Sequence, residues 1–241
     1  MSGTAPAPAK DEDKGKGKDE PHVLDARDLY RFFRSGEEET LALRGVSLHV
    51  GRGETVAVVG PSGSGKSTLL ACLAGLDEPA GGVVHVGGER ISHRPEAERA
   101  RARLRRIGVL LQSGNLIAHL SVRDNIRLVH MAAGRSRGPA PDADRLLEQV
   151  GLSSRARALP HELAGGELAR AGLAVALAND PDILLADEPT GELDGQTEQR
   201  VLALLRDRAK DGRGVLVVTH SPEVVRIADR VIGLRDGRIE S

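Results

Sequence analysis

The chain has 241 residues, of which 34 are Lys or Arg and 35 are Asp or Glu, so its formal net charge is −1. This balance excludes the basic surface of a typical nucleic-acid-binding protein, and the length suits one domain with an inserted lobe. No run approaches the roughly 18 apolar residues of a membrane span, and the first residues lack the apolar core of a signal peptide. We therefore expect an intracellular protein that does not cross the membrane.

Residues 1–22 differ from the rest of the chain in composition. Ala-Pro repeats are followed by a charged run at 10–20, and this segment holds four of the six lysines. With almost no apolar content, such a segment cannot offset the entropy of ordering, so we predict a disordered tail. The interleaved charges favour a solvated tail over one that contacts lipid headgroups, and the sequence leaves both interpretations open.

A glycine-rich loop follows a short β-prone run at 55–59. It reads Gly60-Pro61-Ser62-Gly63-Ser64-Gly65-Lys66-Ser67-Thr68 and matches the phosphate-loop pattern G-x-x-x-x-G-K-[ST]. The glycines let backbone N–H groups converge on an anion, and the helix expected at 68–74 presents its positive end to it. We expect Lys66 to reach the β- and γ-phosphates and the Ser67 hydroxyl to bind Mg²⁺. Cys72, the only cysteine, is expected to be a small core residue.

The middle of the chain changes from strands to helices. Apolar strands are expected at 46–50, 56–59, 107–111, 183–186 and 215–218, interspersed with helical stretches, which indicates an α/β core. Residues 113–164 carry no strand pattern and contain a helical pattern at 142–150, preceded by a Gly/Pro-rich loop at 134–141. We interpret this stretch as an inserted helical lobe.

Two carboxylates close the apolar run at 182–186. Asp187 is placed to hold Mg²⁺ through water, and Glu188 to polarise an attacking water. Two acids after a strand can also cap a helix. The phosphate loop earlier in the chain favours the catalytic interpretation.

Further motifs follow in an order that resembles the ATP-binding subunits of ABC transporters, over about residues 23–239. Gln112 falls at the Q-loop glutamine, which senses Mg²⁺ and links to a membrane partner, and His220 at the switch histidine. Asp194 falls in the D-loop, and Phe33 at the aromatic residue that stacks on adenine. Singly, such a Gln is usually a plain loop residue, and such a His is usually a satisfied polar residue at a strand end. Only the shared register with Lys66 and Glu188 favours function.

The signature motif departs from the family pattern. Leu163-Ala164-Gly165-Gly166-Glu167 stands where relatives commonly have L-S-G-G-Q. The resemblance implies that the signature of one subunit closes over the γ-phosphate held by another. Ala164 lacks the serine hydroxyl, whose hydrogen bond to a charged group is worth about 1.5–3 kcal/mol, and Glu167 adds a negative charge. The backbone N–H groups of Gly165 and Gly166 and the helix end remain as donors.

The resemblance implies a P-loop NTPase fold: a RecA-like core with an antiparallel β subdomain, and a helical subdomain inserted at about 113–178. It implies a subunit that binds and hydrolyses ATP with Mg²⁺, pairs head to tail with a second ATP-binding subunit, and drives an integral membrane permease from the cytoplasmic face. The motif pattern is nearest to lipoprotein-release and macrolide-export ATPases.

Alternatives to a fully active transport ATPase remain open. One is a weakly hydrolysing regulatory clamp, and another is the degenerate half of a heterodimer; both are motivated by Ala164. An ABC ATPase acting on DNA or ribosomes would carry long coiled-coil insertions or a second fused domain, and this chain has neither.

Overall fold

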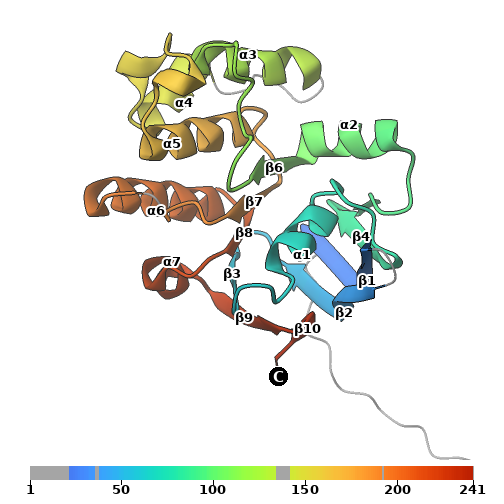
Figure 1. The fold of residues 1–241 in the computed structure, drawn as a ribbon. Helices are drawn as coiled ribbons and strands as arrows, with labels where there is room; N and C mark the ends of the chain where they lie inside the picture. The colour runs from blue at the N-terminus through green and yellow to red at the C-terminus, as the bar shows by residue number, and fades with distance from the viewer. Residues whose placement is uncertain (1–21, 36–37, 134–141, 192, 241) are drawn as a thin grey trace, which may run out of the picture.

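The computed structural model describes residues 22–35, 38–133, 142–191 and 193–240, and these form an α/β fold with two sheets and a helical layer (Figure 1). The expected tail, apart from His22, and the expected loop at 134–141 lie outside the described residues. The His22 ring stacks on His49 with ring centroids 4.1 Å apart. No helix within the described ranges has the length and apolar character of a membrane span.

The central sheet has six strands in the order β10-β9-β3-β8-β7-β6. Strands β3, β6, β7, β8 and β9 run parallel, and only β10 is antiparallel. Every residue of β7 and β8 is buried, which explains their continuous apolar sequences. The bounds are β3 (Thr55–Val59), β6 (Ile107–Leu110), β7 (Ile183–Asp187), β8 (Gly214–Val218), β9 (Arg230–Arg235) and β10 (Arg238–Ile239).

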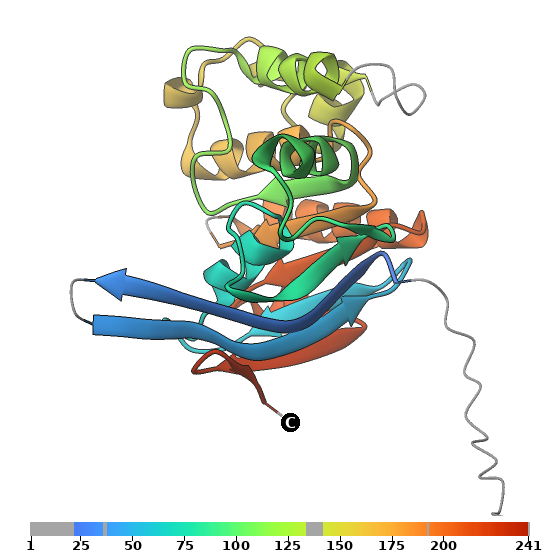
Figure 2. The same ribbon diagram turned by 90° about the vertical axis from the view of Figure 1, so that its right-hand side faces the viewer.

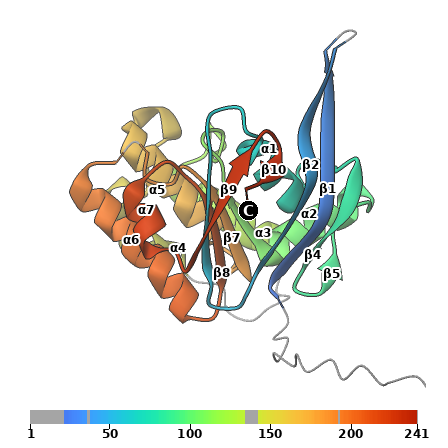
Figure 3. The ribbon, with the colours of Figure 1, turned by 90° about the horizontal axis from the view of Figure 1, so that it is seen from below.

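Helices cover both faces of this sheet. Helix α1 (Lys66–Leu73) lies on one side, and α6 (Gly195–Lys210) and α7 (Pro222–Ile227) lie on the other (Figures 1 and 3). Alternate residues of β8 belong to two hydrophobic clusters: Leu216 packs with α1, and Val217 packs with α6. The two clusters hold the sheet between them.

A second, antiparallel sheet has the order β2-β1-β4-β5 and packs on α1. Its strands are β1 (Leu24–Ser35), β2 (Glu38–Val50), β4 (Gly81–Val86) and β5 (Glu89–Arg90). The β1–β2 hairpin extends as a long ribbon beyond the rest of the fold (Figures 2 and 3). The strand expected at 46–50 is the last part of β2.

The remaining helices lie beyond β6 and form the upper part of the molecule in Figure 1. They are α2 (Glu96–Arg106), α3 (Val122–Ala133), α4 (Ala143–Gln149) and α5 (Gly165–Ala176), with 3₁₀ turns η1 (Ser153–Arg155) and η2 (Pro160–Glu162). Among the described residues of 113–164 there is no strand, and the helical pattern expected at 142–150 is α4. Both of these expectations are confirmed.

Candidate functional site

The phosphate loop joins β3 to α1 and needs glycine at two positions. At Gly65, with φ of 102°, an added Cβ would lie 2.5 Å from the Ala42 carbonyl oxygen; at Gly60 it would lie 2.0 Å from that of Leu234. No side chain caps the start of α1, and its first turn holds no acidic residue. The helix end is therefore left open for an anion.

Lys66 curls back over this loop. Its ammonium donates to the carbonyl oxygens of Gly60 and Pro61 at 2.8 and 2.9 Å, and the residue is only 8% exposed. In the same loop, the buried Ser64 hydroxyl has no hydrogen-bond partner among the described residues. A positive charge and a free hydroxyl within a glycine loop fit a phosphate chain.

Ser67 and Asp187 bring together the two segments predicted to bind the metal. The Ser67 hydroxyl donates to Asp187 Oδ2 at 3.0 Å, from the first turn of α1 to the end of β7. No group of three or more His, Cys, Asp or Glu in the described parts of the chain could hold a metal ion. Mg²⁺ commonly takes one or two protein oxygens and completes its shell with phosphates and water, and this pair fits that pattern.

Glu188 follows Asp187 in a left-handed conformation with φ of 48°, which is costly for a glutamate. Its backbone N–H bonds to the Val218 carbonyl oxygen at 2.9 Å. Its Oε2 accepts from the Thr219 hydroxyl and from the His220 backbone N–H, each at 3.2 Å. The sequence analysis gave Thr219 no role, although a hydroxyl residue directly after the apolar run at 215–218 is a signal that the sequence carries.

A cleft between β6, β7 and α5 gathers several predicted site residues. Gln112, Asp187, Glu188, His220 and Gly165 all line it. Asn115, which the sequence analysis also missed, holds the base of the Gln112 loop: its amide accepts from the Leu111 N–H at 2.8 Å and donates back to the Leu111 carbonyl oxygen at 2.6 Å.

Phe33 lies on β1, opposite Thr40 of β2, and is 44% exposed. The Arg31 guanidinium covers its ring at 4.8 Å from the centroid. Two residues beyond Thr40, the Ala42 carbonyl oxygen meets the phosphate loop at Gly65. The antiparallel sheet thus connects the predicted adenine platform to the loop, while Phe32, 42% exposed, lines a separate apolar pocket with Tyr30 and Leu41.

The signature residues form the start of α5. Ala164 is the N-cap, in extended conformation, and the exposed Gly165 is the first helical residue. The Glu167 carboxylate turns back and accepts from the Ala164 N–H at 3.0 Å.

Asp194 is the N-cap of α6. Its carboxylate accepts from the Thr197 N–H at 3.0 Å and from the Thr197 hydroxyl at 2.9 Å. Both bonds lower the pKa of Asp194, and the bond from the backbone N–H has the larger effect.

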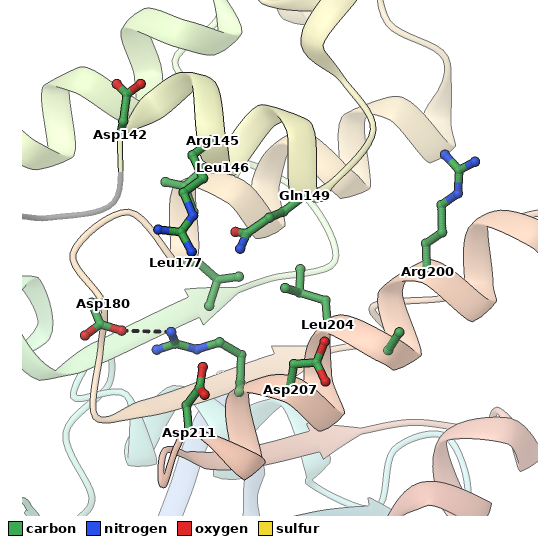
Figure 4. Close-up of a pocket in the computed structure, with 12 residues that line it drawn as sticks. Asp142, Arg145, Leu146, Gln149, Leu177, Asp180, Arg200, Leu204, Asp207 and Asp211 are labelled. Carbon is green, nitrogen blue, oxygen red and sulfur yellow. Dashed lines mark hydrogen bonds and ion pairs between the residues drawn. The ribbon is translucent and has the colours of Figure 1, made fainter.

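A further pocket lies between α4 and α6 (Figure 4). Its lining mixes charges such as Arg145 and Asp207, and Asp180 forms an ion pair with Arg208 at 2.8 Å. None of the predicted site residues lines this pocket.

Comparison with known proteins identifies the family. The ABC transporter family matches residues 43–191. An uncharacterized ABC transporter ATP-binding protein of Thermotoga maritima is 43% identical over 222 residues, which cover 90% of this chain and 94% of the relative. The macrolide export ATP-binding/permease protein MacB of Rhodopirellula baltica is 42% identical over 215 residues, but the chain spans only 31% of its length.

Solved structures agree with this assignment. The dimeric, post-hydrolysis ATP-binding cassette MJ0796, bound to ADP and Pi, is 34% identical and superposes with a TM-score of 0.84. The match covers 90% of this chain and 97% of that one. The chain belongs to the ATP-binding cassettes of the ABC transporter family, whose members bind and hydrolyse ATP.

Proposed function

We propose that two copies of this cassette, or one copy and a related subunit, enclose two ATP molecules and drive a membrane permease. The Ser67–Asp187 bond carries this proposal, because it joins the phosphate loop to the strand end that bears Glu188. This bond brings together, at one edge of the sheet, the pair of metal ligands, the candidate base and the phosphate loop.

Each residue has a role in this scheme. The loop from Gly60 to Thr68 binds the phosphates, with Lys66 supplying the positive charge. Ser67, Asp187 and Gln112 would hold Mg²⁺, which would neutralise phosphate charge. Glu188 accepts the proton of the attacking water. His220 contacts the γ-phosphate side of the site, and Phe33 stacks on the adenine.

The site is completed across the dimer. The Ala164–Glu167 segment and Asp194 of one subunit face the nucleotide held by the other, in a two-fold arrangement. The dimeric state of MJ0796 with ADP and Pi supports this arrangement. Loss of the γ-phosphate removes one contact of each signature and lets the pair open.

The partner is an integral membrane permease, which places the cassette peripherally at the cytoplasmic face of the membrane. MacB relatives, described as ATP-binding/permease proteins, support this proposal, since this chain matches about a third of their length. The cleft lined by Gln112 is the surface through which the opening of the cassette dimer is transmitted to the permease.

The test is Glu188→Gln, which keeps the size and shape of the side chain but replaces the carboxylate that acts as base with a neutral amide. With ATP and Mg²⁺ this variant should form a dimer in light-scattering chromatography and lose turnover. Glu148→Gln, at an exposed position of α4, is the matched control and should behave as the unmodified chain. A variant that stays monomeric and still hydrolyses ATP would refute the assignment of Glu188.

A second candidate is a weakly hydrolysing clamp. Ala164 favours it, because a methyl group cannot donate to a γ-phosphate. ATPase rates measured with and without the permease separate the two: a clamp stays slow in both, whereas a transport ATPase is stimulated.

A further inference from the structure

Glu167 does not project its charge away from the signature helix. It occupies the first turn of α5, and its Oε2 accepts the Ala164 backbone N–H at 3.0 Å. This is one half of a capping box; the other half is missing because the Ala164 methyl cannot accept from the helix. The carboxylate therefore fixes the residue that begins the signature.

Arg155 compensates the charge of Glu167. Its Nε lies 3.3 Å from Oε1, and its Nη2 lies 3.3 Å from Oε2. The same Nη2 donates to the carbonyl oxygen of Glu162, the last residue of η2. Arg155 thus binds the turn that leads into the signature as well as the carboxylate within it.

Two backbone donors of the signature take no part in the hydrogen-bond ladder of α5. The first backbone bond of the helix runs from the Leu168 N–H to the Ala164 carbonyl oxygen at 2.8 Å. The N–H groups of Gly165 and Gly166 precede it and have no place in the helical ladder. They point out of the helix start, together with the positive end of its dipole.

We propose that Arg155 and Glu167 form a positioning pair for the signature. Glu167 holds the helix start so that the two glycine N–H groups face the nucleotide of the second subunit. Arg155 cancels its negative charge, so that the helix start still attracts a γ-phosphate. A glutamate thereby replaces the usual glutamine without repelling the nucleotide. This inference rests on the composite site proposed above.

The test uses ATP-driven dimerisation in the Glu188→Gln background. Arg155→Ala leaves the carboxylate uncompensated near the phosphate, so the ATP concentration for half-maximal dimerisation should rise about fivefold at low salt. The defect should shrink as salt rises, because screening weakens the exposed charge. Arg157→Ala, exposed and two residues away, removes the same charge and should show no such defect.

Rescue distinguishes charge compensation from simple structural damage. With Glu167→Gln already present, adding Arg155→Ala should change dimerisation by less than about twofold, because no carboxylate remains to be compensated. Arg155→Lys keeps the positive charge, so its ATP concentration for half-maximal dimerisation should stay near that of the parent. Thermal unfolding of each variant reports any defect in folding.

The outcomes separate the two proposals. If Arg155→Ala matches Arg157→Ala, or if its defect persists in the Glu167→Gln background, the positioning pair is refuted while the dimer stands. If the Glu188→Gln parent fails to dimerise, both alone and with a related subunit, the composite site is refuted first, and the positioning pair with it.

Discussion

The Glu188 carboxylate is tied to His220 from two directions. Oε2 accepts the His220 backbone N–H at 3.2 Å, and the His220 Nε2 lies 3.7 Å from Oε1. The carboxylate is 22% exposed and the imidazole 60%, so the backbone bond fixes the acid while the ring stays at the surface. The left-handed φ of Glu188 costs about 1–3 kcal/mol, and such strain persists mainly where function needs it.

We expect His220→Ala to lower turnover strongly while leaving ATP bound. The backbone bond to Glu188 survives the substitution, so only the contribution of the ring is lost. Removal of one oriented donor costs about a hundredfold in rate at the lower end. Phosphate release measures turnover, and a fluorescent nucleotide measures binding. His119→Ala, at an exposed position, is the control. Equal turnover in both variants would show that His220 has no catalytic role.

Lys66→Ala should weaken ATP binding by at least about tenfold, since each hydrogen bond to a charged group is worth about 1.5–3 kcal/mol. The substitution also frees the carbonyl oxygens of Gly60 and Pro61, which would then face the phosphates. Isothermal titration with ATP and Mg²⁺ gives the affinity. Lys210→Ala, exposed on α6, is the matched charge control. Unchanged affinity in Lys66→Ala would overturn the phosphate-loop assignment.

The parallel core was predictable because its strands are buried on both faces. Strands β7 and β8 read as unbroken apolar runs, and their ends then located Asp187 and His220. The long β1 strand was not found from its residues, because charged positions and register shifts interrupt its alternation. Helix α2 was missed for a related reason: in a run of Arg and Glu, only Ala102 is buried.

The position of the Glu167 side chain in the signature could not be predicted from the sequence. The sequence predicted a charge of Glu167 near the phosphate, whereas its carboxylate accepts from the Ala164 backbone N–H and from Arg155 Nη2. Arg155 lies twelve residues upstream in a 3₁₀ turn. No helical or strand periodicity links the two positions, so only the folded chain brings them together. The nucleotide contacts of Phe33 and Gln112 stay predictions.

Cys72 should be unreactive in the native protein. Burial, and secondarily the Asp77 carboxylate, raise the pKa of its thiol to about 12, and the residue is 1% exposed. Since the thiolate is the reacting form, a thiol-specific reagent at pH 8 should label the folded chain very slowly. One equivalent per chain should react after denaturation in urea. Rapid native labelling would show that the α1 region opens readily.

The last prediction concerns Ala164→Ser, and the structure separates two effects of the new hydroxyl. Ala164 is an N-cap in the extended conformation that serine favours, so the hydroxyl can accept from the Glu167 N–H and complete the capping box. This should raise the free energy of unfolding by about 1 kcal/mol, measured by urea titration without nucleotide.

The same hydroxyl can also donate to the γ-phosphate across the dimer. One charge-assisted bond sets a ceiling of roughly 10- to 150-fold on turnover, and partial solvation should reduce the gain to a few-fold. Leu163→Met, at the neighbouring partly buried position, is the control for a change in the same segment. Higher stability with unchanged turnover would mean that the hydroxyl acts only as a cap, and that the backbone donors of Gly165 and Gly166 already suffice. Higher turnover of the isolated chain but not of its complex with a related subunit would instead mark a heterodimer in which the partner supplies the intact signature.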